Sequence, residues 1–550
     1  MTATSQNENR PPVARGGLPG LGHLLKLRTD PIELMQRVHR QCGELGEIRL
    51  ARQPVVMMYG EQAQEAFFRA PDDQLDQPSA YPFMTPIFGE GVVFDADPEQ
   101  RRQAMKNQSL RDKFMRGHAE VIAEETERMI AGWGQSGEID LLDFFAELTI
   151  YTSSACLLGR EFRAELTSEF AVAFRELEGG TDALAYVNPY LPLPTFRRRD
   201  RARLRLVELL TQIIDRREAE GRKPQDLVYI LTRLKNEDGT PRYTPNVITG
   251  MFISMMFAGH HTTSGTAAWS LIELLRNPDV EERVTNELDD LFADGRAVSF
   301  HALREIPELE CAIKEALRLH PPLILLMRKV MHAFHYKGWT IPAGTTVAVS
   351  PAVSNRMPEH FPDPDLYHPD RYKPGREEDK RSFAWIPFGG GRHRCVGAAF
   401  AMMQLKAIFS VLLRRYEFEM AQPSDSYRND NSKMVIQLEH PCRVRYRRRD
   451  AVAPSAKHTE ARDQSPTAPI AVEVDRDLCQ GHGVCVGEAP FMFELVKETN
   501  KVRILAREAS DADRAAVEAA IKYCPTHALR RGGPVSKGLP EPPSRRQPKE

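Results

Sequence analysis

A glycine-rich segment that ends near a single cysteine carries the clearest chemistry in this chain. It runs from Phe388 to Gly397 and reads Phe-Gly-Gly-Gly-Arg-His-Arg-Cys-Val-Gly, with Cys395 as its thiol. Glycines let backbone N–H groups approach a sulfur atom, and a helix predicted from Ala398 to Arg415 would place its positive N-terminus beside the thiolate. A thiolate held in this way suits the axial position of a haem iron, where it favours O–O cleavage. A buried structural cysteine after a turn is the simpler alternative.

The spacing inside the segment decides between these interpretations. The order Phe388-x-x-Gly391-x-His393-x-Cys395-x-Gly397 resembles the haem-binding signature of the cytochrome P-450 superfamily, in which most members carry arginine at the position of His393. The resemblance implies a mainly α fold with a minor β sheet, and haem b bound through its iron to Cys395.

A carboxylate and two guanidiniums upstream of this segment agree with the resemblance. Glu315 and Arg318 lie three residues apart on one face of a predicted helix, where they can pair. Most such pairs are exposed and contribute little. Followed by the Pro-Asp-Arg-Tyr run that contains Arg371, they resemble the Glu-Arg-Arg network of the superfamily, which implies a structural role for all three.

A long apolar segment from Val247 to Ile272 is interrupted by polar residues at its centre. Polar groups there would be costly in lipid, so we expect a core helix beside a polar site. Ala258-Gly259 leaves room for dioxygen, and the Thr262 hydroxyl could stabilise reduced oxygen and relay protons to it. A threonine inside a helix more commonly bonds to its own backbone. His261 stands where most superfamily members have an acidic residue.

His261 is typical of one branch of the superfamily. The Gly-His-His-Thr segment, His393 and the 15-residue loop from Tyr81 to Asp95 together resemble the sterol 14α-demethylases, most closely the soluble bacterial type. An aromatic loop of this kind can also be plain packing, but the three features coincide. The resemblance implies removal of the 14α-methyl group of a sterol in three steps that consume dioxygen and NADPH.

The same resemblance implies roles for individual residues. The haem propionates would be held by Tyr81, Arg102, Arg328 and His393. The sterol cavity would be lined by Tyr81, Phe83, Met84, Phe88 and Leu325. Glu178 would pair with His261 and, with Arg199 and Asp200, would link the oxygen site to solvent.

A second set of cysteines lies near the C-terminus. Cys479, Cys485 and the Cys524 of a Cys-Pro pair follow the bacterial ferredoxin pattern, with His482 at the middle ligand position. Three thiols with His482 as fourth ligand would also suit structural zinc. The residues flanking these cysteines resemble single-cluster ferredoxins of the 3Fe-4S type, which implies three thiolates for three irons. A 4Fe-4S cluster with histidine ligation is the other iron–sulfur alternative.

Length and composition indicate how these sites are organised. A chain of 550 residues needs more than one core, and its net charge of -2 gives no field that attracts nucleic acid. We expect a haem-thiolate monooxygenase domain at 1–449, a flexible linker at 450–469, a small α+β ferredoxin-like domain at 470–531 and a disordered tail at 532–550. Few cysteines and a polar N-terminus predict a cytoplasmic protein without a membrane anchor.

The two domains suggest one function, because a haem-thiolate oxygenase consumes electrons singly and a ferredoxin delivers them singly. The sequence has no Gly-x-Gly-x-x-Gly fingerprint, so we expect a separate NAD(P)H-dependent ferredoxin reductase as partner, with a sterol and dioxygen as substrates. One alternative is another cytochrome P-450 hydroxylase acting on a different terpenoid, which would not need the Tyr81 to Asp95 signature. A non-catalytic haem sensor or electron carrier would need neither Thr262 nor an apolar cavity.

Overall fold

The structure is a computed structural model that describes residues 9–96, 112–450 and 470–532, apart from short gaps within the last two ranges. The chain divides into two units, Met1–His458 and Thr459–Glu550. The division falls inside the predicted linker, of which 451–469 lie outside the described residues, as do Arg102 and the predicted tail beyond residue 532. Each unit has its own set of helices and sheets.

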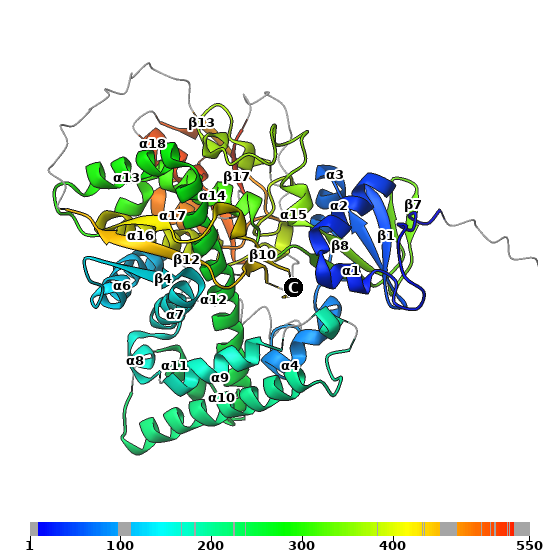
Figure 1. The fold of residues 1–550 in the computed structure, drawn as a ribbon, viewed down its shortest axis with the longest axis horizontal. Helices are drawn as coiled ribbons and strands as arrows, with labels where there is room; N and C mark the ends of the chain where they lie inside the picture. Colours follow the sequence, from blue (N-terminus) through cyan, green and yellow to red (C-terminus); the bar gives the residue numbers. More distant parts are fainter. Residues whose placement is uncertain are drawn as a thin grey trace, which may run out of the picture. The chain divides into compact units, whose positions relative to one another are not determined.

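Helices dominate the larger unit, as predicted. Figure 1 shows its longest helix, α12 (Pro245–Arg276), running through the unit. The Thr244 hydroxyl accepts the N–H of Val247 at 3.3 Å and caps the first turn. Every residue from Thr263 to Leu274 is buried, as expected of a helix that is apolar on all sides. The apolar segment from Val247 to Ile272 is therefore a core helix.

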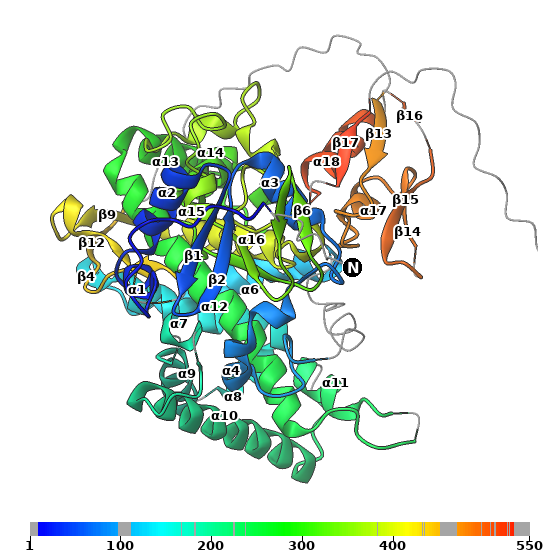
Figure 2. The same ribbon diagram turned by 90° about the vertical axis from the view of Figure 1, so that its right-hand side faces the viewer.

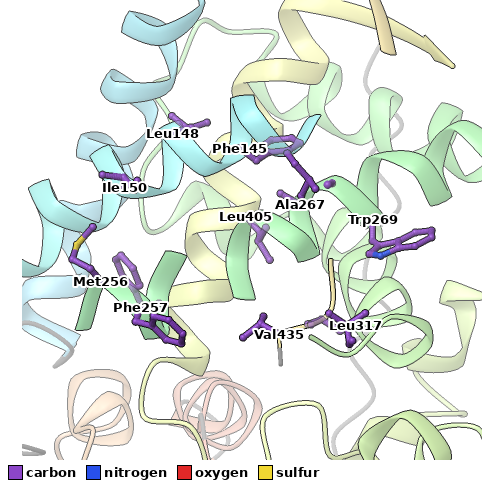
Figure 3. Packing of buried hydrophobic residues seen from close by; sticks show 14 of the residues in the cluster. Phe145, Leu148, Ile150, Met256, Phe257, Ala267, Trp269, Leu317, Leu405 and Val435 are labelled. Atoms are coloured by element: carbon purple, nitrogen blue, oxygen red, sulfur yellow. The ribbon is translucent and has the colours of Figure 1, made fainter. Parts of the chain in front are cut away.

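Three helices pack around α12 and build the core. They are α7 (Leu141–Ser153), α14 (Pro307–Leu319) and α16 (Ala398–Arg415). Figure 3 shows apolar side chains from all four helices gathered in one cluster. By length and composition alone the segment Leu141–Leu158 could cross a membrane, but 78% of it is buried inside the protein. Its apolar character is that of a core helix.

A five-stranded sheet in the order β1-β2-β8-β5-β3 forms the minor β part of this unit. β2 pairs with β8 in parallel and the other neighbours are antiparallel. Because β5 carries Met327 and Arg328, the sheet fixes both residues. The strands are β1 (Leu45–Leu50), β2 (Gln53–Met58), β3 (Leu75–Asp76), β5 (Leu326–Val330) and β8 (Thr346–Val349). A second sheet, β4-β12-β9, consists of β4 (Ser136–Asp140), β9 (Tyr416–Met420) and β12 (Arg443–Arg448).

The remaining helices cover this core. Figures 1 and 2 show α10 (Pro194–Ala219) crossing near the beginning of α12. The others are α1 (Leu24–Thr29), α2 (Pro31–Cys42), α3 (Glu61–Arg69), α4 (Thr85–Phe88), α6 (Asp112–Ile130), α8 (Arg160–Glu165), α9 (Ser168–Glu178), α11 (Leu227–Arg233), α13 (Pro278–Phe292) and α15 (Pro351–Ser354). Two further strand pairs are β6 (Phe334–Tyr336) with β7 (Trp339–Ile341), and β10 (Asn429–Asp430) with β11 (Gln437–Leu438).

Two element boundaries follow from single residues. α10 begins at Pro194, since proline is tolerated in a first turn that needs no N–H donor. β7 and β8 are separate strands, since Gly344 between them adopts φ +82° in a turn.

The smaller unit combines two short sheets with two helices. β13 lies between β16 and β17, with antiparallel pairing on both sides, and β14 and β15 form a hairpin. Leu478, Met492, Phe493 and Val517 are buried and form its core. The elements are β13 (Ile470–Val474), α17 (Val484–Glu488), β14 (Phe493–Val496), β15 (Lys501–Ile504), β16 (Glu508–Ala509), α18 (Arg514–Lys522) and β17 (Leu529–Arg531).

The predicted Glu-Arg-Arg residues lie together in the core of the larger unit, each with 0% exposure. Arg318 forms a bidentate pair with Glu315 at 2.7 and 2.8 Å, and Arg371 donates its Nε to Glu315 Oε1 at 3.1 Å. Glu315 also accepts the N–H of His368 and the Tyr372 hydroxyl. The outer N–H groups of both arginines donate to backbone carbonyls between residues 355 and 366. One carboxylate thus organises the irregular chain that leads to the Cys395 loop.

Replacing Glu315 with glutamine should destabilise the larger unit. The change keeps the side-chain shape but leaves two buried guanidiniums without their shared counter-ion, and we expect the free energy of unfolding to fall by about 3–5 kcal/mol. Denaturant unfolding followed by circular dichroism measures this free energy of unfolding. Glu359→Gln, at an exposed glutamate, is the control. An equally small decrease in the free energy of unfolding of both variants would show that the network does not stabilise this region.

Candidate active site and cluster site

The Cys395 loop is closed by a backbone hydrogen bond and pressed against a neighbouring helix. The N–H of Cys395 donates to the carbonyl of Phe388 at 2.9 Å. Gly391 adopts φ +61°, and a Cβ there would lie 2.2 Å from the carbonyl oxygen of Phe68 on α3. No side chain fits at that point, so the glycine is needed for both its conformation and its size.

The thiol of Cys395 is solvent-accessible although it lies deep in the domain. Desolvation raises its pKa, while the N–H of Gly397, which donates to the sulfur, and the charge of Arg394 lower it. The sulfur also lies just before the N-terminus of α16. These groups would stabilise a thiolate once a metal ion replaces the proton, so the site fits a metal ligand better than a packed structural cysteine.

Tyr81 and Arg328 present donors to the same region. The Tyr81 oxygen accepts the N–H of Met327 at 3.0 Å, which leaves its own proton for another acceptor. Arg328 is 4% exposed and donates Nη1 to the carbonyl of Met327 at 2.9 Å. Among the residues that the structure describes, no carboxylate lies within 4.0 Å of this guanidinium. A buried cation is costly when the carboxylates that act on it, here those of Asp72 and Asp76, lie beyond ion-pair distance, so the arrangement fits a ligand with carboxylates, such as the propionates of haem.

His393 is held by Asp72, a residue that the sequence analysis did not identify. The His393 Nε2 atom lies 2.6 Å from Asp72 Oδ1. Burial would raise the pKa of Asp72, but the hydrogen bond and charge of His393, with the charges of Arg392 and Arg328, outweigh it and lower the pKa. The pairing leaves Nδ1 of His393 available to a second acceptor. The two residues are 321 positions apart, so no local pattern could have indicated the contact.

The oxygen-site residues predicted on the long helix lie next to Glu178, the last residue of α9. His261 Nε2 is 2.6 Å from Glu178 Oε1. The Thr262 hydroxyl donates to the carbonyl of Ala258 at 2.7 Å, the local bond common for threonine in helices, and its oxygen remains an acceptor. Gln437 of β11 donates to the His261 carbonyl and to Ser264 Oγ, both at 3.1 Å. Gln437 therefore anchors the helix at this point, and sequence reasoning missed it.

A continuous aromatic wall joins the propionate donors to His261. Ring centroids lie 4.9 Å apart for Tyr81 and Phe94, 6.1 Å for Phe94 and Phe88, 5.8 Å for Phe88 and Phe257, and 5.3 Å for Phe257 and His261. Phe94 and Phe257 were not among the predicted lining residues. The other predicted lining residues, Phe83, Met84 and Leu325, belong to the same apolar core.

The aromatic loop is held onto α12 by close backbone contact. A Cβ on Gly250 would lie 2.2 Å from the carbonyl oxygen of Phe88. The same oxygen accepts a hydrogen bond from Arg203 Nη2 at 3.2 Å, and Arg203 Nη1 donates to Asn246 at 2.9 Å. Arg203 of α10 thus joins the loop to α12.

Arg199 and Asp200, predicted to extend the Glu178–His261 pair, lie on the same helix as Arg203. Arg199 is fully buried, and its Nε donates to Asp200 at 2.8 Å while its Nη2 donates to the carbonyl of Pro189 at 2.9 Å. A Cβ on Gly180, two residues after Glu178, would lie 2.5 Å from the Arg199 side chain. The arginine therefore packs directly behind the chain segment that carries Glu178.

In the smaller unit the three predicted cysteine ligands line one pocket. Cys479, Cys485 and Cys524 surround it together with His482. Burial, and then the neighbouring thiols of Cys524 and Cys479, raise the pKa of Cys485 to about 12. The N–H of Val502 donates to the Cys479 sulfur at 3.4 Å. Closely spaced thiols around one pocket are suited to a shared positive centre.

The spacing of these ligands is too wide for one small ion. A tetrahedral zinc site with Zn–S bonds of about 2.3 Å needs sulfurs about 3.8 Å apart. Among the described residues, the three sulfurs and His482 form no set of three donor atoms that all lie within 4.8 Å of one another. His482 Nε2 instead lies 3.1 Å from Gln480 Oε1. The pocket therefore fits a multi-atom iron–sulfur cluster rather than zinc.

Comparisons with known proteins agree with both sites. Two family models match the sequence, cytochrome P450 over residues 11–445 and a 4Fe-4S single cluster domain over residues 472–530. The sterol 14alpha-demethylase of Mycobacterium tuberculosis is 60% identical over 445 residues, which cover 80% of this chain and 99% of the relative. A lanosterol 14-alpha demethylase of Bos taurus is 33% identical over 449 residues, 80% of this chain and 88% of the relative.

One solved structure supports the fold of the larger unit. A retinoic acid-bound cyanobacterial CYP120A1 aligns with a TM-score of 0.71 at 21% sequence identity, and the alignment covers 80% of this chain and 99% of that one. At this identity the likeness concerns the fold alone. It confirms the predicted architecture of helices with a minor sheet.

Gly391→Ala should disturb the thiol loop. An alanine loses roughly 1–2 kcal/mol of stability in a left-handed backbone conformation. Because the added methyl group also overlaps the Phe68 carbonyl, the free energy of unfolding should fall by more than this amount. We expect much of the purified variant to lack haem, as measured by the absorbance ratio of haem to protein. Gly344→Ala is the control, because its φ is also positive, at +82°, but nothing lies within 4 Å of its added Cβ. Equal haem content in the two variants would contradict the steric argument.

Proposed function

The chain belongs to the cytochrome P450 family, and within it to the sterol 14α-demethylases, and from this premise we propose that it joins an oxygenase and its immediate electron donor in one chain. The haem domain removes the 14α-methyl group of a sterol, and the attached ferredoxin domain supplies the electrons. The aromatic wall from Tyr81 to His261 is the observation that carries this proposal, because a flat apolar substrate needs such a surface beside the oxygen site.

The residues present fit haem b as the cofactor of the larger unit. Cys395 would ligate the iron, while Tyr81, Arg328 and His393 would hold the propionates, and we keep Arg102 in this role although it lies outside the described residues. Haem, when bound, supplies the binding and reductive activation of dioxygen. The chain positions the sterol against that centre through Phe83, Met84, Phe88 and Leu325.

Proton delivery to the oxygen site is assigned to the residues on and beside α12. His261 carries a proton on Nε2, which it shares with Glu178 at 2.6 Å. Glu178 is part-buried beside the exposed Gly179, so it can receive protons from solvent and pass them to the histidine. The Thr262 hydroxyl is the final donor, because its proton can turn from the Ala258 carbonyl toward the substrate side.

The reaction proceeds in three steps, as in the family that the sequence resembles. The 14α-methyl group becomes an alcohol, then an aldehyde, and finally leaves as formate, with a 14,15 double bond formed in the sterol. Each step consumes one dioxygen and two electrons. The apolar wall favours retention of the intermediates between steps.

Electrons pass one at a time through the smaller unit, which a separate NAD(P)H-dependent reductase must reduce. Three cysteine thiolates and a histidine at the fourth ligand position support a 3Fe-4S cluster, in which one corner of the cube lacks iron. We place the protein in the cytoplasm, because a reducing compartment keeps ligand thiols available.

Turnover without an added ferredoxin tests the pairing. Given NADPH, a ferredoxin reductase and a lanosterol-type sterol, the intact chain should release one formate per sterol. Cys524→Ala should lose NADPH-driven turnover because its cluster is disrupted, while it keeps the sterol-induced shift of the Soret band. Cys42→Ala, at a half-buried cysteine outside both sites, is the matched control. Fast oxidation of fatty acids without any spectral response to 14α-methyl sterols would contradict the substrate assignment.

The cluster type has its own test. The oxidised full-length protein should show the spin-one-half resonance of a three-iron cluster, and iron analysis should give three irons beyond the haem iron. His482→Cys restores a fourth thiolate and should allow a four-iron cluster. Four irons beyond the haem iron in the unaltered protein, or zinc in place of the cluster iron, would show that the three-thiolate assignment is wrong.

A further inference from the structure

Glu178, His260 and His261 bring three metal-ligand groups together at the end of α9. Their donor atoms all lie within 4.8 Å of one another. His261 Nε2 is 2.6 Å and His260 Nε2 is 3.6 Å from the same oxygen of Glu178. The proposed reaction uses only one of the two histidines, so the role of His260 has to be found elsewhere.

The hydrogen bonds of Thr149 fix the tautomer of His260. The Thr149 hydroxyl donates its single proton to the carbonyl of Phe145 at 2.8 Å, with a weaker share to that of Ala146 at 3.2 Å. It can therefore only accept from His260 Nδ1, which lies 2.8 Å away. Nδ1 of His260 thus carries the hydrogen, and Nε2 presents a lone pair.

This lone pair faces the carboxylate. Glu178 Oε1 lies 3.6 Å from His260 Nε2 and 2.6 Å from His261 Nε2, so it shares the proton of His261 and receives none from His260. A cation in the place of that proton would have the carboxylate oxygen and the lone pairs of both imidazoles as ligands.

We propose that Glu178, His260 and His261 form a binding site for a divalent transition-metal ion, of which Zn²⁺ is the best fit. Two imidazoles and one carboxylate with an open fourth position are a ligand set that proteins use for zinc. Tetrahedral bonds of about 2.0–2.1 Å place ligand atoms about 3.3 Å apart, between the two observed separations. Thr149 supplies the outer contact that orients a zinc-binding histidine.

An ion can reach the site, and charged groups of both signs lie beside it. Glu178 and His261 are part-buried, and the next residue, Gly179, is exposed, so an ion can enter from that side. The positive charge of Arg175 near His260 opposes cation binding, whereas the negative charge of Glu178 favours it. The ion would take the place of the proton that His261 shares with Glu178. It would therefore also block proton delivery, a consequence that rests on the proposed function.

A second group of side chains that could bind a metal lacks free acceptor atoms. Asp140, His440 and Cys442 also lie within ligand distance of one another. The Asp140 carboxylate, however, already accepts the N–H groups of Leu142 and Asp143 as the cap of α7, and also the N–H and S–H groups of Cys442. Its acceptor positions are used, so capping explains the cluster completely.

Zinc binding to the full-length holoprotein tests the proposal, without substrate or reductant. Titration calorimetry with Zn²⁺ gives the affinity, and X-ray absorption at the zinc edge identifies the ligands. We expect nitrogen and oxygen neighbours at about 2.0–2.1 Å with imidazole scattering. Thr149→Val, which removes the acceptor for His260 Nδ1–H, should weaken zinc binding about 10–100-fold. Thr149→Ser keeps the hydroxyl and should bind like the unaltered protein.

Two results would overturn the site. Sulfur neighbours at about 2.3 Å would show that zinc binds the cysteines instead. Equal zinc affinity in Thr149→Val and Thr149→Ser, with His260→Gln also unchanged, would show that His260 is not a ligand. His301→Ala, at an exposed histidine, controls for adventitious binding. Since none of these measurements involves turnover, failure here leaves the demethylase proposal intact, and failure of sterol turnover leaves the zinc site intact.

Discussion

A single buried carboxylate, Glu315, is the constraint on which the rest of the haem domain depends. It pairs with two fully buried guanidiniums, of which that of Arg371 also contacts Glu378, and their remaining N–H groups donate to backbone carbonyls between residues 355 and 366. Carbonyls in irregular chain have no partners in a helix or a sheet, so the guanidiniums supply the donors that they lack. The network therefore fixes the irregular segment that precedes the Cys395 loop and the start of α16.

Both metal-binding loops use the same physical device. In each, a glycine of positive φ lies so close to a carbonyl oxygen, 2.2 Å from its notional Cβ, that no side chain fits. Gly391 rests on Phe68 in the haem domain, and Gly481 rests on Asn500 in the ferredoxin domain. Close backbone contact restricts the loop without using side chains, so the thiols themselves remain available for the metal.

The sequence predicted what short patterns encode. The Cys395 loop and the α12 helix follow from residues close together in the chain. The three-cysteine pocket follows from a known ligand pattern that includes the distant Cys524, and Glu315, Arg318 and Arg371 follow from a known order of motifs. Asp72, Gln437 and Phe257 were not predicted, because their roles arise from contacts between segments that only the fold brings together, 321 residues apart for Asp72 and His393.

Arg328 links the cofactor to the amount of protein that a cell keeps. A buried guanidinium that no carboxylate of the described residues approaches within 4.0 Å weakens the fold until a negatively charged ligand pairs with it, and any ligand that binds only the folded state raises the folded population by mass action. A newly made chain would then either bind haem and stay folded or be cleaved by proteases in its opened form. The haem supply thus acts as a quality check on this enzyme, setting its abundance as well as its activity.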